Sequence, residues 1–135
     1  MNETIKLLME RKSVRQFVRE EMPREDVEAI LNAAVQAPSA GNMTLWTIIN
    51  VTDPEKKLAL SKSCDNQPFI ATAPLVLVFC ADYRRWFEVF KTLDLGEELR
   101  VPATGDFMLA TADTIIAAHA PVVAADALDY GSCYI

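Results

Sequence analysis

Two short, almost entirely apolar runs constrain the fold of this chain most. Leu45–Val51 and Leu75–Ala81 are rich in β-branched, aromatic and other apolar side chains, a composition that favours β-strands. Polar residues do not alternate with apolar ones in either run, so both predicted strands are expected to be covered on both faces. Helices on each side of a sheet would provide that cover. A third strand is predicted to begin at Ser132 and to be cut short at Ile135.

Helices are predicted around these strands. They are expected at residues 4–11, at Pro23–Ala37, from Asp53 onward, and from about Gly105 to Asp129. Pro23 and Pro54 fit the first position of a helix, and Asp53 is a suitable cap. Pro121 lies inside the last helix and should kink or divide it, because proline removes one backbone donor.

Length and charge narrow the class of protein. The 135 residues, of which 51% are hydrophobic, are enough for one domain with a buried core. With 13 basic and 19 acidic residues the formal charge is −6. An acidic chain is not expected to bind nucleic acid or an anionic membrane.

The sequence also predicts the compartment. The most apolar stretch, Thr114–Leu128, falls short of the ~20 residues that a bilayer span needs, and the first 12 residues lack the apolar segment of a signal peptide. Cys64, Cys80 and Cys133 form no C-x-x-C pair, so neither a disulfide framework nor a metal site is expected. These features predict a cytoplasmic protein with reduced thiols.

A local reversal of charge occurs near the start of the chain. Residues 11–19 carry four basic side chains and no acidic one. If the backbone is extended, Arg11, Ser13 and Arg15 share one face, opposite Lys12 and Val14. Two guanidinium groups flanking a hydroxyl suit a phosphate, because each can donate to its oxygens. A solvated basic patch at the end of a helix has the same spacing, so the segment alone leaves both interpretations open.

The loop at residues 37–42 joins the second predicted helix to the first predicted strand. Its small residues, Gly41 among them, let the backbone approach a flat ligand, and Asn42 offers both a donor and an acceptor. An ordinary helix-to-strand turn has a similar composition. By itself, the loop does not decide between a binding site and a connection.

Taken together and in this order, these segments resemble the nitroreductase family of flavin enzymes. The resemblance is carried by Arg-Lys-Ser-Val-Arg-Gln-Phe at 11–17, Ala-Pro-Ser-Ala-Gly-Asn at 37–42 followed by Trp46, Asn66-Gln67 with Phe69, a strand followed by Asp82, an alanine-rich helix, and Gly-Ser-Cys-Tyr-Ile at 131–135. It covers essentially the whole chain.

The resemblance implies an α+β fold, a three-layer α/β/α sandwich with a mixed, mainly antiparallel central sheet. It also implies a homodimer with FMN at the interface, NAD(P)H as electron donor, and a small flat acceptor such as a nitroaromatic or a quinone. The flavin would carry the ping-pong hydride chemistry, so no catalytic side chain is expected. Family members continue beyond the position of Ile135. Residues 1–135 are therefore expected to be a single domain without its C-terminal part.

Each motif also receives a role from the resemblance. Arg11 and Ser13 would hold the FMN phosphate with the backbone of Lys12 close by, and Arg15 would lie near the pyrimidine edge of the flavin. The other predicted cofactor contacts are Asn66 or Gln67 at the ring edge of the same subunit, the loop residues Pro38, Ser39, Ala40 and Asn42, and Tyr134 and Ile135 beside the ring. Of the loop residues, Pro38, Ser39 and Asn42 would reach the flavin of the partner subunit.

Residues 83–104 are expected to form a variable wall or lid over the substrate. Trp86, Phe87 and Phe90 are spaced to share one helical face, where they contact substrate or simply pack. His119 is interpreted as a helix-packing residue.

Two positions depart from the family pattern. Thr44-Leu45 stands where relatives often have Gln-Pro, and Asp129-Tyr130 where they often have Gly-Leu. These changes predict an altered loop and local strain at the end of the long helix. A non-catalytic dimer that binds FMN weakly or not at all remains an alternative to the enzyme, as does a specialised relative such as a dehalogenase.

Overall fold

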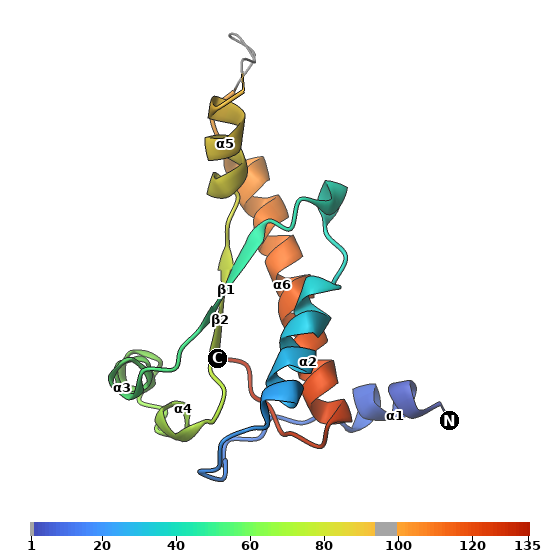
Figure 1. Ribbon diagram of the computed structural model, residues 1–135, viewed down its shortest axis with the longest axis vertical. Helices are drawn as coiled ribbons and strands as arrows, with labels where there is room; N and C mark the ends of the chain where they lie inside the picture. The colour runs from blue at the N-terminus through green and yellow to red at the C-terminus, as the bar shows by residue number, and fades with distance from the viewer. Residues whose placement is uncertain (1, 94–99) are drawn as a thin grey trace.

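The longest helix, α6 (Thr104–Ala127), packs against more of the described elements than any other helix or strand (Figure 1). The computed structural model describes residues 2–93 and 100–135. Helix α2 (Arg24–Val35) lies along α6. Ala34 in α2 and Ala110 and Ala117 in α6 are fully buried, and such small side chains allow two helices to approach closely.

The two predicted strands form an antiparallel pair. In β1 (Trp46–Asn50) and β2 (Leu77–Ala81), Trp46 lies opposite Ala81 and Asn50 opposite Leu77. Among the helices at residues 2–93 and 100–135, α6 is the one that packs against both strands. Leu45 and Trp46 are buried, whereas Ile49 is 49% exposed. The described residues therefore place one helical layer on this pair.

Helix α3 (Pro54–Ser63) begins as the sequence predicted. The Asp53 side chain accepts hydrogen bonds from the backbone N–H groups of Glu55 (2.8 Å) and Lys56 (3.4 Å). Helix α4 (Phe69–Thr72) follows and was not predicted. Lys57 donates from Nζ to the carbonyl of Ala73 (2.9 Å), which ties α3 to the end of α4.

The two ends of the described chain pair with each other. Helix α1 (Glu3–Glu10) is capped by Asn2 and leads into an extended segment. Ser13 and Ser132 form an isolated parallel bridge, and the Val14 N–H donates to the Ser132 carbonyl at 2.8 Å. The residues predicted to start a third strand thus pair with the basic segment, because a backbone already extended there offers them a free edge.

Helix α6 covers the predicted range within two residues at each end. It continues through Pro121, so division of the helix at this residue is wrong. Buried neighbours such as Ala117 and Val122 hold the helix on both sides of the missing donor. By length and composition α6 could cross a membrane, since residues 104–113 extend the apolar stretch seen in the sequence. Its packing against α2 and both strands instead makes it a core helix of this fold.

Two further elements flank the start of β1. The short 3-10 helix η1 (Ala40–Asn42) lies between α2 and β1, and helix α5 (Arg84–Lys91) follows β2 (Figure 1). After α6, Asp129 has a φ of +64°. An aspartate tolerates this left-handed conformation less well than glycine, as predicted from the sequence.

Candidate functional site

The basic segment lies against the last residues of the chain. Its backbone is extended, as predicted, and the Ser13–Ser132 bridge joins it to the segment that contains Tyr134 and Ile135. Lys12, Ser13 and Arg15 are exposed and, like Arg11, form no ion pair within the described residues. This part of an acidic chain therefore presents uncompensated positive charge.

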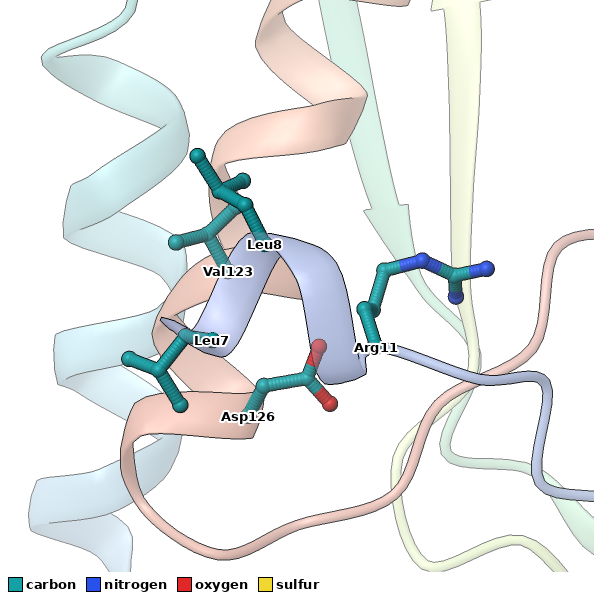
Figure 2. A pocket seen from close by; sticks show the side chains of 5 residues that line it. All are labelled: Leu7, Leu8, Arg11, Val123 and Asp126. Atoms are coloured by element: carbon teal, nitrogen blue, oxygen red, sulfur yellow. The ribbon is translucent and has the colours of Figure 1, made fainter. Parts of the chain in front are cut away.

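Arg11 is the most constrained of the basic residues. Its stem lines a small pocket with Leu7, Leu8, Val123 and Asp126, and its guanidinium extends away from the Asp126 carboxylate (Figure 2). Nη1 is fully buried and has no hydrogen-bond partner in the part of the chain that the structure describes. A buried charged donor without an acceptor is costly, and Nη1 is available to donate to an anionic oxygen.

A second buried polar atom without a partner lies in the segment paired with this one. The Ser132 hydroxyl is buried and forms no hydrogen bond to the described residues. Buried polar side chains rarely lack a partner. Two such atoms in paired segments, one of them cationic, fit a ligand that carries several acceptor oxygens.

Tyr134 extends this region toward α6. Its hydroxyl lies 2.9 Å from Nδ1 of His119. Partial burial raises the pKa of Tyr134, while the positive charge of Arg11 lowers it and the negative charge of Asp126 raises it. His119 is exposed, so the interpretation of this residue as a packing residue is wrong. Its ring bonds to Tyr134 because α6 ends just before the terminal segment.

Residues 65–67 form a left-handed turn after α3. Asp65 and Asn66 have φ values of +59° and +52°. Gln67 donates from its side chain to the Cys64 carbonyl (3.0 Å), whereas the Asn66 side chain is exposed. The rings of Phe17 and Phe69 lie 6.3 Å apart, so the basic segment and the segment that follows this turn are neighbours.

The loop at residues 38–42 lies at the other end of α2. Helix α2 has 12 residues and therefore a length of roughly 18 Å at 1.5 Å per residue. It separates the loop from the basic segment (Figure 1). Within one copy of the chain, the structure does not bring these two predicted groups into one site. Pro38 and Asn42 are exposed, and Ser39 and Ala40 are half-buried.

A buried carboxylate anchors the first half of this loop. The Ala40 N–H lies 3.1 and 3.2 Å from the two carboxylate oxygens of Asp113. Asp113 lies in α6 and is 3% exposed. The Ser39 hydroxyl accepts a hydrogen bond from the Thr44 N–H at 2.9 Å. The loop therefore has a defined conformation although its outer residues face solvent.

The three aromatic residues of α5, which the spacing placed on one helical face, line one pocket. The pocket has a volume of about 190 Å³ and is lined by Met43, Leu45, Tyr83, Trp86, Phe87, Phe90, Arg100, Asp106 and Leu109. The ring centroids of Trp86 and Phe90 are 5.7 Å apart, and Phe87 is 9% exposed. These rings contact one another and also line the pocket. Part of the expected lid, residues 94–99, lies outside the described residues.

An ion pair closes one side of this pocket. Arg100 donates from both terminal nitrogens to Asp106 at 2.6 Å each, and its guanidinium lies 5.6 Å from the centre of the Phe87 ring. The Arg100 guanidinium, together with the Ala103 N–H, lowers the pKa of Asp106 to about 2. The pocket thus has aromatic walls and a neutralised polar rim.

Sequence reasoning missed several residues of these sites. Ser132 lies in a motif that was singled out, but its burial could not be read from the motif. Asp113 has a signal, because an acidic residue on an otherwise apolar helix needs a partner. No signal in the sequence identifies Arg85, which donates to the Thr44 carbonyl at 2.6 Å.

Comparison with known proteins identifies the family to which this chain belongs. The model of the nitroreductase family matches residues 8–135. The chain belongs to the nitroreductase family. An FMN reductase (NADPH) of Bacillus subtilis is 31% identical over 137 residues, which span 100% of this chain and 54% of that protein. An NADPH-flavin oxidoreductase of Vibrio harveyi is 28% identical over all of this chain and 54% of its own length.

Solved structures confirm the expected fold class. The structure of Bacillus megaterium NfrA1 has a TM-score of 0.89 and 30% identity, covering 99% of this chain and 54% of that one. The NADPH:FMN oxidoreductase of Vibrio harveyi in complex with NAD+ has a TM-score of 0.82 and 27% identity, covering 94% and 53%. The chain thus has the family's α+β fold and spans about half the length of the relatives it matches.

Proposed function

We propose that this chain carries the FMN-binding part of an NAD(P)H-dependent flavin oxidoreductase that acts on flat acceptors such as nitroaromatics and quinones. The buried, unpaired Nη1 of Arg11 is the observation that carries the proposal. A hydrogen bond to a charged group contributes about 1.5–3 kcal/mol. A phosphate at this position would supply the missing acceptor, so the residues present fit FMN.

The neighbouring residues fit the same ligand. Ser132 offers a buried hydroxyl without a partner, and Ser13 and Lys12 add an exposed hydroxyl and a second positive charge. We assign the phosphate to Arg11, Ser13 and the Lys12 backbone, with Ser132 as a further donor. Phosphate binding by several convergent donors resists exchange with water better than binding by one.

The remaining roles concern the flavin ring. Arg15 is an exposed cation on the same segment, placed to stabilise negative charge on the pyrimidine edge. Asn66 is a better candidate than Gln67 for the ring edge, because the Gln67 amide already donates to Cys64. Tyr134 and Ile135, both exposed, would lie beside the ring.

A second copy of the chain would complete the site. The loop residues Pro38, Ser39 and Asn42 are remote from Arg11 in one copy (Figure 1), which supports their assignment to the flavin of the partner. Helix α6 also exposes a row of large apolar side chains, among them Met108 and Ile115 at 65% and 64%. A surface of this kind is typical of an interface between subunits.

When bound, FMN supplies the chemistry, since it accepts a hydride from NAD(P)H and delivers it to an acceptor. The chain binds and orients the cofactor and provides the wall against which an acceptor lies. Trp86, Phe87 and Phe90 form an aromatic surface suited to a flat molecule. The cytoplasm, where cysteines stay reduced, suits the three free cysteines.

The visible absorption spectrum of the purified chain, with and without added FMN, tests the proposal. A yellow protein that NADPH bleaches and a quinone or nitroaromatic recolours is the expected result. A folded, dimeric protein that stays colourless and takes up no FMN would contradict it and would favour the non-catalytic alternative.

A further inference from the structure

The turn that leads from the loop at 38–42 into β1 has an unfavourable backbone conformation. Gly41, Asn42 and Thr44 have φ values of +58°, +55° and +48°. Glycine and asparagine adopt this left-handed region readily, but a β-branched residue does not. Thr44 therefore keeps this conformation only because its surroundings hold it there.

Two side chains from α5 add to the restraint that the hydrogen bonds of Thr44 to Ser39 and Trp46 provide. Arg85 donates from Nη2 to the Thr44 carbonyl at 2.6 Å and lies 3.3 Å from its hydroxyl. Trp86 donates from Nε1 to the Met43 carbonyl at 2.6 Å. Both carbonyls of the turn are thus fixed from the same helix.

Helix α5 is itself anchored to the strand pair. The Asp82 carboxylate accepts from the Thr47 hydroxyl at 2.6 Å and lies 3.3 Å from the Arg85 N–H. Thr47 belongs to β1, so the start of α5 is tied to the sheet. A helix held in this way can act as a rigid support for a strained turn.

The same contacts connect the turn to the aromatic pocket. Met43 and Trp86 both line that pocket, and the hydrogen bond between them forms part of its wall. A shift of α5 against the turn would therefore change both the pocket and the hydrogen bonds from Arg85 and Trp86 to the carbonyls of Thr44 and Met43.

We propose that Arg85 and Trp86 are positioning residues: they hold Thr44 in its left-handed conformation, fix the direction of residues 38–42, and so couple this loop to the aromatic pocket. The effect on flavin rests on the proposed function, because it requires the loop to contact FMN. The restraint on the loop itself does not depend on any ligand.

Amide hydrogen exchange of the chain without ligand tests the restraint. Arg85→Ala is compared with Arg84→Ala, since Arg84 lies on the same helix but pairs with Glu88 instead. We expect exchange in a peptide covering residues 38–46 to be roughly tenfold faster in R85A, the effect of losing one charge-assisted bond, and unchanged in R84A. Equal exchange in the two variants would overturn the proposal. Trp86→Phe, which keeps an aromatic ring but removes the Nε1 donor, gives a second comparison should R85A lose global stability.

FMN affinity provides the functional readout. R85A is expected to bind FMN several-fold more weakly than R84A. Adding Thr44→Gly to R85A should restore most of that loss, because glycine adopts a positive φ without strain. A merely structural role of Arg85 predicts no such rescue, and its absence would overturn the positioning role. If no form of the chain binds FMN while exchange still separates R85A from R84A, the proposed function fails and the restraint stands.

Discussion

One added methyl group at Gly131 tests the pairing between the two ends of the described chain. A Cβ at this position would lie 2.6 Å from Cγ2, 2.7 Å from Cβ and 2.9 Å from Cγ1 of Val14. Carbon atoms in good contact are about 3.5–4.0 Å apart, so the overlap approaches 1 Å. Because the Val14 Cβ is attached to the backbone, rotation of the side chain cannot remove it. The backbone at residues 13–14 must move away from Ser132.

Two effects determine how much Gly131→Ala lowers the free energy of unfolding. Overpacking costs about 1–3 kcal/mol, and loss of the hydrogen bond from Val14 to Ser132 costs about 0.5–1.5 kcal/mol. We expect Gly131→Ala to lower the free energy of unfolding by about 1.5–4.5 kcal/mol. Gly105→Ala is the matched control, since a Cβ there meets nothing within 4 Å. Gly105 lies in α6, where alanine is favoured by about 1 kcal/mol.

Urea denaturation followed by circular dichroism measures both variants. The expected order of midpoints is G131A lowest, the unmodified chain next, and G105A equal or higher. A G131A midpoint at or above that of the unmodified chain, with G105A in its expected place, would refute the pairing of these segments.

Further predictions concern single carboxylates. Asp113→Ala should lower the free energy of unfolding by about 1–3 kcal/mol, because the Ala40 N–H loses its acceptor; Asp113→Asn, which keeps one oxygen, should lose less in the same urea assay. Asp53→Ala should cost about 0.5–2 kcal/mol through loss of the α3 cap, and an unchanged midpoint would argue against that cap. Arg100 holds the pKa of Asp106 near 2, below its ordinary value of 3.8. The ionised carboxylate therefore adds stability above about pH 4 that is lost as the pH falls toward 2. The difference in free energy of unfolding between the unmodified chain and Asp106→Asn should shrink as the pH falls from about 4 toward 2. A difference that stays constant would contradict the ion pair between Arg100 and Asp106.

Much of the fold could be predicted because its signals are local. Asp53 caps α3 through bonds to the next turn, so cap and helix start are encoded within a few residues. The apolar runs around β1 and β2 likewise identify both strands within two residues at each end. Helix α4 escaped prediction because its four residues, Phe69–Thr72, are too few for a periodic pattern. The bridge from Ser13 to Ser132 depends on the path of the whole chain.

The candidate sites likewise contain residues that the sequence could predict and residues that it could not. Arg11 and the loop at 38–42 could be singled out because their residue types suit a phosphate and a flat ring. The anchors of that loop could not, since Asp113 and Arg85 reach it from helices distant in the sequence. Sequence patterns identify residues that contact a ligand more readily than they identify the residues that hold those ligand contacts in place.

The relative affinities of the chain for FMN and for riboflavin test the phosphate site most directly. The two ligands differ only in the phosphate, so the ratio of their dissociation constants isolates its contribution. We expect the unmodified chain to prefer FMN strongly and Arg11→Ala to reduce that preference by roughly 10- to 150-fold, the equivalent of about 1.5–3 kcal/mol. Affinity for riboflavin should hardly change. An Arg11→Ala variant that keeps the full preference for FMN would contradict the assignment of Arg11 to the phosphate.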